Sequence, residues 1–202
     1  ELSSVPYDFS FTRLPVLGEL ALTYRCNEAC LFCYAGCGAD AGSSAALGSG
    51  LGDGLCRSGP ASPDRDELST QEAKRVIDIF KREAKIPFFS FTGGEPLLRE
   101  DLEELASYAR DLGLRTKLIT NGSLASPERA KSLKAAGIDT VQVSLESPEA
   151  AVHDYLCGRP GAWRKTVAGI ANLSGAGISV QTNTTITTRN RDGLGRLPAF
   201  LS

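Results

Sequence analysis

The chain has 202 residues, of which 42% are hydrophobic and 23% are charged, and its net charge at pH 7 is -2. This length and apolar content predict one globular domain with a sizeable core. The near-neutral charge and the scattered basic residues argue against nucleic acid as a partner. No apolar run is long enough to cross a membrane, and the first residues lack the zones of a signal peptide. We therefore expect a cytoplasmic protein without a membrane partner.

The first part of the chain divides into a short segment and the beginning of a core. Residues 1–18 are expected to form an N-terminal segment, and residues 19–202 the core domain. Polar and apolar residues alternate over 19–24, which predicts a first strand. Residues 36–66 are rich in Gly, Ala and Ser, which is typical of a flexible insertion.

Strand and helix patterns then alternate along the rest of the chain. Ser69 and Glu72 form a capping box ahead of apolar residues at helical spacing, which predicts a helix start. Helices are expected over 69–84, 99–112 and 127–136, with further helical material up to 175, and strands over 87–92, 114–120, 138–145 and 178–187. This alternation predicts an α/β fold with a parallel sheet, whose functional residues gather at the carboxyl ends of the strands.

Three cysteines follow the first strand at a spacing that suits an iron-sulfur cluster. Cys26, Cys30 and Cys33 are separated by three and then by two residues. A cubane cluster held by four thiolates is saturated, whereas a cluster held by three keeps one iron free for a substrate or cofactor. The motif therefore predicts a reactive 4Fe-4S cluster with these three residues as its metal ligands.

A closed zinc site is the alternative use of the same loop. Cys37 lies four residues after Cys33, so four thiols are available for one tetrahedral ion. Zinc sites usually present two separated pairs of ligands, whereas these thiols crowd one short loop. The many helix and strand patterns disfavour a disulfide framework. Cys56 and Cys157 have no partner that the sequence names.

Polar groups also stand at the ends of later strands. Gly93-Gly94-Glu95-Pro96 closes the strand at 87–92, and its glycines let a ligand approach the backbone without meeting a Cβ. Ser144 and Glu146 point to the face opposite Val143, which indicates a wet inner face at the end of the strand at 138–145. For Glu146 the alternative is a cap on the next helix.

The cysteine loop, with Phe32 before the last cysteine, resembles the CxxxCxφC signature of the radical S-adenosylmethionine (SAM) superfamily, and the resemblance extends over about residues 19–190. It implies a partial (β/α)6 radical SAM barrel, of which this chain has five strands and lacks the sixth. It also implies two cofactors, a 4Fe-4S cluster and SAM bound to the fourth iron. A flavodoxin or ferredoxin would supply the electron that cleaves SAM to a 5'-deoxyadenosyl radical, which abstracts hydrogen from the substrate.

The same resemblance implies a set of cofactor-binding residues. The glycine motif would hold the amino group of SAM, and Ser144 and Glu146 its ribose or carboxylate. An arginine would pair with the SAM carboxylate as a bidentate fork, although the usual Arg-Gly order is reversed here as Gly158-Arg159. The expected set is Phe32, Tyr34, Gly93, Gly94, Glu95, Pro96, Asn121, Ser144, Glu146, Arg159, Arg164 and Asn183.

The segment at 153–166 resembles the branch that includes peptide and sulfatase maturases and haem-pathway enzymes. The predicted function is modification of a peptide or protein side chain, with haem or other cofactor synthesis on a small-molecule substrate as the alternative. A non-catalytic zinc-binding module is the alternative from another class. His153, at the start of this segment, is expected to be a surface or helix-start residue and not a ligand. The absence of methionine and the unfinished helix pattern after Asn190 predict a fragment that continues into a sixth strand and a cysteine-rich extension.

Overall fold

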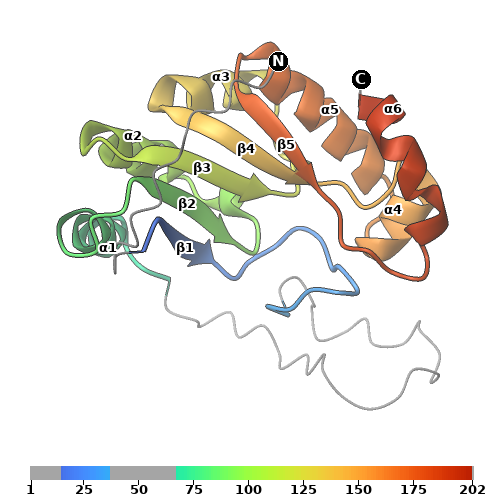
Figure 1. Cartoon of the computed structure of the whole chain (residues 1–202), viewed down its shortest axis with the longest axis horizontal. Helices are drawn as coiled ribbons and strands as arrows, with labels where there is room; N and C mark the ends of the chain where they lie inside the picture. The colour runs from blue at the N-terminus through green and yellow to red at the C-terminus, as the bar shows by residue number, and fades with distance from the viewer. Residues whose placement is uncertain (1–14, 37–66, 202) are drawn as a thin grey trace, which may run out of the picture.

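Five parallel strands form one sheet in the computed structural model, which describes residues 15–36 and 67–201. The strands lie in the sheet in the order in which they follow along the chain (Figure 1). They are β1 Leu17–Thr23, β2 Phe88–Gly93, β3 Arg115–Thr120, β4 Ile138–Ser144 and β5 Ser179–Asn183. The expected α/β fold with five strands is confirmed, since each strand is joined to the next through helical structure.

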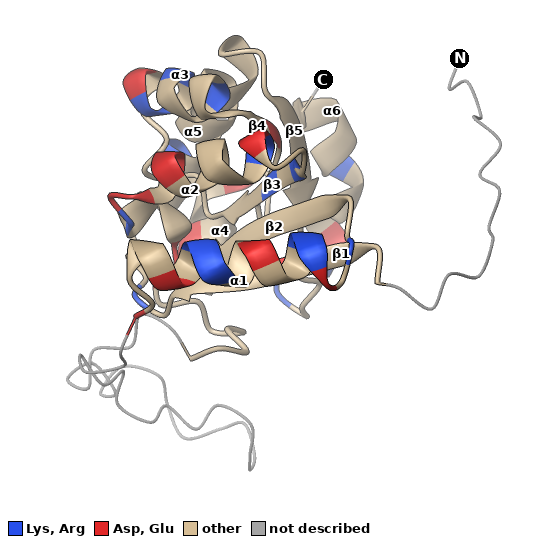
Figure 2. Cartoon of the chain, turned by 90° about the vertical axis from the view of Figure 1, so that its left-hand side faces the viewer, with Lys and Arg blue, Asp and Glu red and all other residues tan. Residues whose placement is uncertain are grey.

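Helices separate the strands. They are α1 Thr70–Arg82, α2 Leu102–Asp111, α3 Pro127–Ala136, α4 Ala150–Leu156, α5 Ala162–Gly175 and α6 Leu197–Leu201, with short 3-10 turns η1 Pro96–Leu98 and η2 Arg191–Arg196. Ser69 caps α1 and completes the expected capping box with Glu72. Gly137 ends α3 with a φ of 97°, a left-handed conformation that glycine adopts without strain. Charges of both signs alternate on the outward side of α1 (Figure 2).

One face of the sheet carries the hydrophobic core. Phe89 and Phe91 of β2 are fully buried there, beside Leu118 of β3 and Val141 of β4. The rings of Phe80 in α1 and Phe89 meet edge to face with centroids 5.4 Å apart. This face packs against α1, α2, α3 and α5, whose buried residues belong to the same core.

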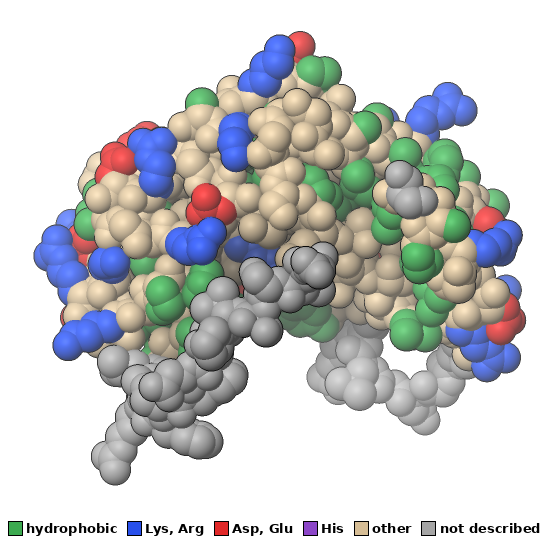
Figure 3. Space-filling model, turned by 45° about the horizontal axis from the view of Figure 1, so that its top comes forward, with side chains coloured by type: hydrophobic (Ala, Val, Ile, Leu, Met, Phe, Trp, Pro, Cys, Tyr) green, Lys and Arg blue, Asp and Glu red, His purple; other side chains and the backbone are tan. Residues whose placement is uncertain are grey.

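The other face of the sheet is polar. Because side chains alternate along a strand, Ser90, Lys117 and Gln142 lie opposite the core residues. Register places Ser90 beside Lys117, and Lys117 beside Thr140. This inner face leads to the carboxyl ends of the strands, where the cysteine loop follows β1. Over the surface seen in Figure 3, Lys and Arg side chains are spread out and form no single basic patch.

Some expected element boundaries are wrong. β5 ends at Asn183 instead of residue 187, because Thr185 leaves the ladder and its backbone N–H donates to Glu146 Oε2 at 2.7 Å. The helix expected from residue 99 begins at Leu102, after η1. The proposed insertion at 36–66 lies outside the described residues except for Gly36, as does most of the N-terminal segment.

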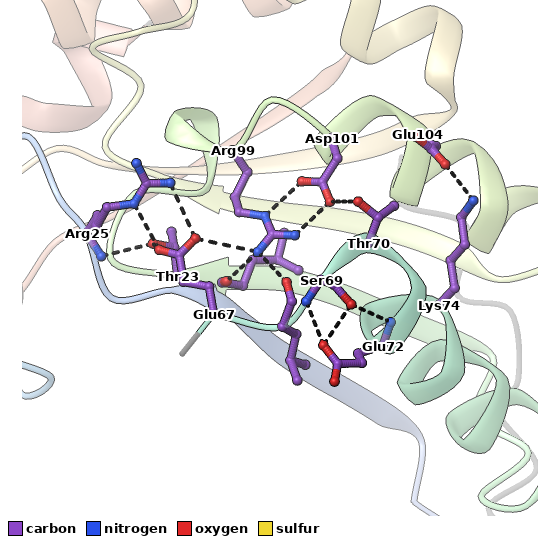
Figure 4. A network of polar contacts seen from close by, with 12 residues as sticks. Thr23, Arg25, Glu67, Ser69, Thr70, Glu72, Lys74, Arg99, Asp101 and Glu104 are labelled. Carbon is purple, nitrogen blue, oxygen red and sulfur yellow. Dashed lines mark hydrogen bonds and ion pairs between the residues drawn. The ribbon is translucent and has the colours of Figure 1, made fainter. Parts of the chain in front are cut away.

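A buried ion pair joins the first two β-α units. Arg99 donates to both carboxylate oxygens of Asp101, at 2.8 and 2.6 Å, and its Nη1 also donates to the carbonyl oxygens of Leu22 and Leu68. The Arg99 guanidinium holds the pKa of the Asp101 carboxyl below its usual value. Figure 4 shows how these groups continue into hydrogen bonds among Thr23, Arg25 and Glu67. The end of β1 is therefore fixed to the starts of α1 and α2.

Candidate functional site

The cysteine loop leaves the carboxyl end of β1 as an irregular turn. Cys26, Cys30 and Cys33 are partly exposed and form no disulfide. The backbone N–H of Cys33 donates to the carbonyl of Cys30 at 3.1 Å, which closes the loop between them. Burial raises the pKa of the Cys26 thiol to about 12. A thiol in such a site becomes an anion only when a metal centre compensates its charge.

The distances among the three cysteine sulfurs help to distinguish a zinc ion from an iron-sulfur cluster. Two thiolates on one zinc ion are at most about 4.6 Å apart, because each Zn–S bond is about 2.3 Å. Among the residues that the structure describes, the three loop sulfurs do not gather within 4.8 Å of one another. A cluster places each thiolate on a different iron and so accepts a wider spread. The donor set fits the predicted 4Fe-4S cluster, whereas Cys37 of the zinc alternative lies outside the described residues.

The glycine motif is packed against the start of the cysteine loop. Gly94 N–H donates to the Thr23 carbonyl at 2.7 Å, and Glu95 N–H to the Arg25 carbonyl at 2.8 Å. A Cβ built on Gly93 would lie 2.3 Å from the Thr23 carbonyl, and one on Gly94 would lie 2.2 Å from the Arg25 carbonyl. The glycines are therefore needed for the approach of another backbone segment. The sequence had indicated the approach of a ligand, and that role stays a prediction.

Glu95 links the ends of β2 and β3. Its carboxylate is fully buried and accepts from the Thr120 hydroxyl at 2.7 Å, from Asn121 N–H at 2.8 Å and from Leu97 N–H at 2.9 Å. Burial nevertheless raises the pKa of Glu95. Because these donors occupy both oxygens, a contact with the amino group of SAM would have to use a remaining lone pair. Pro96, also buried, begins η1 directly behind this carboxylate.

Asn121 lies beside the cysteine loop, and its role in binding a cofactor stays a prediction. Its side-chain N–H donates to Asn27 Oδ1 at 2.9 Å, and Asn27 in turn donates to the Ser123 hydroxyl at 2.8 Å. The Ser123 hydroxyl donates back to Asn121 Oδ1 at 2.7 Å. Sequence reasoning missed Asn27 and Ser123, since Asn27 is a variable position of the cysteine motif and Ser123 belongs to no motif. Together the three side chains hold the loop against the end of β3.

The end of β4 places two predicted residues side by side. Ser144 pairs in register with Asn183 of β5, and both lie on the inner face at the carboxyl edge. Glu146 follows as a buried carboxyl, and burial raises its pKa to about 7. Its Oε2 accepts from Thr185 N–H at 2.7 Å. Glu146 does not cap α4, because Glu149 occupies the N-cap position.

A buried cluster behind the loop was not predicted. Glu28, Cys30 and Cys157 bring one oxygen and two sulfurs within 4.8 Å of one another. His153 lies within α4 and is fully buried, which excludes the surface alternative; its Nδ1 accepts from Glu146 N–H, and its Nε2 is 3.5 Å from the Cys157 sulfur. Burial raises the pKa of Glu28 to about 7. In the sequence, only the spacing of the buried residues of α4 could have suggested that the carboxyl end of this helix packs against the cysteine loop.

The backbone of α4 anchors the loop as well. The N–H of Ala29 donates to the Cys157 carbonyl at 3.0 Å, and Leu31 N–H donates to the Leu156 carbonyl at 2.9 Å. A Cβ on Gly158 would lie 2.4 Å from the Ala29 carbonyl, so the contact requires glycine there. The loop is thus held from β2, β3 and α4 together.

Four predicted residues stand apart from these contacts. Tyr34 is 95% exposed, and Phe32 is partly buried. Arg159 and Arg164 are exposed on the α4–α5 connection and on α5. Neither guanidinium has a hydrogen bond or ion pair with another residue in the described ranges, so the structure does not join them to the site. Their pairing with the SAM carboxylate stays a prediction.

The sequence profile of the Radical SAM superfamily matches residues 20–193. The chain belongs to this superfamily. Membership implies the 4Fe-4S cluster and SAM, and the donor set and cysteine spacing described above fit the cluster. The partial barrel expected from the resemblance is confirmed by solved structures. The crystal structure of Streptococcus suis SuiB bound to S-adenosylmethionine aligns with 93% of this chain and 38% of that chain, at a TM-score of 0.70 and 18% identity.

Two kinds of curated relative are similar in sequence. An AdoMet-dependent heme synthase from Methanosarcina barkeri is 39% identical over 181 residues, which is 90% of this chain and 45% of the relative. One from Nitratidesulfovibrio vulgaris is 44% identical over 63% of this chain and 35% of the relative. The mycofactocin maturase MftC of Mycolicibacterium smegmatis is 33% identical over 92% of this chain and 41% of the relative. The chain thus spans less than half the length of these relatives. None of the described helices is long and apolar enough to cross a membrane.

Proposed function

We propose that the chain is the SAM-binding core of a radical SAM enzyme of haem-type tetrapyrrole synthesis. The observation that carries the proposal is the 39% identity with a heme synthase over 90% of the chain. A second relative, named Fe-coproporphyrin III synthase, is 34% identical over 99% of the chain. Both names concern iron tetrapyrroles. The alternative predicted from the sequence, haem or other cofactor synthesis on a small-molecule substrate, is therefore preferred over modification of a peptide.

Some residues of the chain would hold the cofactors, and others position the cysteine loop. Cys26, Cys30 and Cys33 would hold the cluster, which together with SAM supplies a radical able to remove hydrogen from an unreactive C–H bond. Ser144 and Asn183 present side-chain donors and acceptors at the same edge of the sheet. The bonds of Asn121 and Glu95 fix the loop in one position before any ligand binds. A flavodoxin or ferredoxin would supply the electron.

The test follows hydrogen from the tetrapyrrole to SAM. Anaerobically reconstituted protein would be incubated with SAM, dithionite and iron coproporphyrin III deuterated in its propionate side chains. We expect deuterium in the 5'-deoxyadenosine that is released, measured by mass spectrometry. A Cys33→Ala variant serves as the control without cluster. If wild-type protein cleaves SAM and no deuterium is transferred, the proposed substrate class is wrong.

Peptide modification is the second candidate. It has two supports, the 33% identity with the maturase MftC and the similarity of fold to SuiB, which has been solved bound to its precursor peptide SuiA. The fold similarity alone does not separate the candidates, because one scaffold hosts many reactions. Hydrogen transfer from a deuterated peptide, with none from the porphyrin, would favour this candidate.

A further inference from the structure

One lysine stands on the inner face of the sheet. Lys117 lies in the middle of β3 and is partly buried, between Ser90 of β2 and Thr140 of β4. Lysine side chains are mostly exposed to solvent, so a partly buried lysine in a strand of this sheet calls for an explanation. On the core face of the same strand, Leu118 is fully buried. The charge of Lys117 therefore lies on the face that is turned away from the core.

The ammonium of Lys117 is only partly satisfied by the protein. It donates to Gln142 Oε1 at 2.7 Å. An ammonium has three donors, and within 15–36 and 67–201 no carboxylate forms an ion pair with it. Two of its N–H groups are thus available to a ligand.

Ser90 adds a second unsatisfied group next to the lysine. Its side chain is fully buried, and its hydroxyl has no hydrogen-bond partner in the structure. A buried hydroxyl without a partner is destabilising, because it has lost its hydrogen bonds to water. Because Ser90 pairs in register with Lys117, the free hydroxyl and the ammonium lie on neighbouring strands of the same face.

A cavity of about 390 Å³ opens at the amino ends of the strands, with Lys117 in its wall and Ser90 outside it. Its wall includes Lys117, Thr140, Gln181 and Phe88, and also Arg115, whose guanidinium lies 6.0 Å from the Phe88 ring. The carboxylate of Asp139 also faces this cavity, where Oδ2 accepts from Thr116 N–H at 3.1 Å. The volume is in the range of pockets for small organic ligands.

The direction of the lysine side chain relates this cavity to the cysteine loop. Its register partner on β4 is Thr140, yet its ammonium bonds to Gln142, two residues closer to the carboxyl edge. Two further residues along β4 lead to Ser144, about 7 Å beyond at the usual rise of a strand. The ammonium that borders the cavity is thus bonded to a residue that stands closer to the carboxyl edge than the register partner of the lysine.

From these observations we infer that Lys117 and Ser90 form a subsite for a carboxylate of the substrate, with Arg115 as a second cation at the cavity wall. A carboxylate accepts from an ammonium and a hydroxyl together, and both are charge-assisted hydrogen bonds. The inference deepens the proposed function, on which its choice of ligand rests: the carboxylate is a propionate of an iron tetrapyrrole. The subsite orients the substrate and takes no part in bond cleavage.

The test compares a ligand that has free carboxylates with one whose carboxylates are esterified. Binding of iron coproporphyrin III and of its tetramethyl ester to anaerobically reconstituted, SAM-loaded protein would be measured by absorbance. We expect Lys117→Met to weaken binding of the acid about tenfold or more, to leave the weak binding of the ester unchanged, and to be rescued largely by Lys117→Arg. Lys134→Met, an exposed lysine on α3, is the matched control. Iron content and SAM binding should not change in any variant.

Ser90→Ala separates a binding role from a structural one. It removes a buried hydroxyl without a partner, so we expect higher stability of the ligand-free protein together with weaker binding of the acid. Equal binding of acid and ester, or an unchanged affinity in Lys117→Met, would overturn the subsite while leaving the proposed function intact. If wild-type protein binds neither porphyrin, a peptide rich in glutamate becomes the probe. Lys117-dependent binding of that peptide would support the subsite against the proposed function, and its absence would overturn the subsite.

Discussion

The two faces of the sheet are built from the same strands and differ in nearly every property. On the helix side, Phe91, Leu118 and Val143 are completely buried and apolar. On the inner side, Ser90, Lys117 and Gln142 carry polar groups. Along each strand, residues that stabilise the core therefore alternate with residues that could bind a ligand. We therefore expect the inner face to accept substitutions without loss of the fold and the helix face not to accept them.

The largest effect is expected at the edge where the inner face ends. Cys26→Ala, Cys30→Ala or Cys33→Ala should each remove nearly all the bound iron, because a cluster with two protein ligands is not retained. Cys157→Ala should keep it, since this thiol is not part of the three-cysteine motif, although its sulfur lies within 4.8 Å of the Cys30 sulfur. Iron analysis and the absorbance of reconstituted protein measure both. Loss of iron in Cys157→Ala with retention in Cys30→Ala would reverse the assignment.

Substitutions within the strands test the contrast between the faces directly. Phe91→Ala should lower the free energy of unfolding by about 3 to 5 kcal/mol, through lost burial and the cavity left behind. Gln142→Ala on the inner face should change it by no more than about 1 kcal/mol. Chemical denaturation of the two variants gives the values. Similar losses in both would show that the inner face is a second core.

The ion pair that holds the end of β1 should have an intermediate effect. Asp101→Asn leaves the Arg99 charge, which is 8% exposed, with weaker partners, and we expect a loss of about 2 kcal/mol. Arg99 keeps the pKa of Asp101 low, so the pair contributes fully above the ordinary carboxyl pKa and is lost as the pH falls through the lower value of the folded protein. The stability of the variant should therefore fall less steeply in acid than that of the wild type. If the stability of Asp101→Asn fell as steeply in acid as that of the wild type, this account would be contradicted.

The smallest expected effect is a change in how steeply the free energy of unfolding varies with pH. Burial raises the pKa of Glu146 from 4.5 to about 7, so between these values the folded protein holds a proton that the unfolded chain releases. Stability then falls as the pH rises through this window. Glu146→Gln should flatten the fall, with the exposed Glu83→Gln as control. Since Glu28 is raised in the same way, some slope should remain.

Much of the fold and part of the site were predictable from local patterns. The capping box of Ser69 and the alternation in β4 depend on neighbours in sequence, and both were confirmed. The partners of the cysteine loop were not predictable, because Glu28 and Cys157 meet only through the packing of α4. Lys117 belongs to no sequence motif, and its place beside Ser90 depends on the register of β2 with β3.

The bonds from α4 to the cysteine loop have a consequence for biosynthesis. The loop leaves the ribosome early, whereas Cys157 and Gly158, which hold Ala29 in place, are made much later. Until then the loop lacks one of its three anchors, and its thiols stand exposed to oxygen and to stray metal ions. Delivery of iron and sulfide should therefore succeed mainly after α4 has been synthesised, which makes cluster insertion a late event in the maturation of this chain.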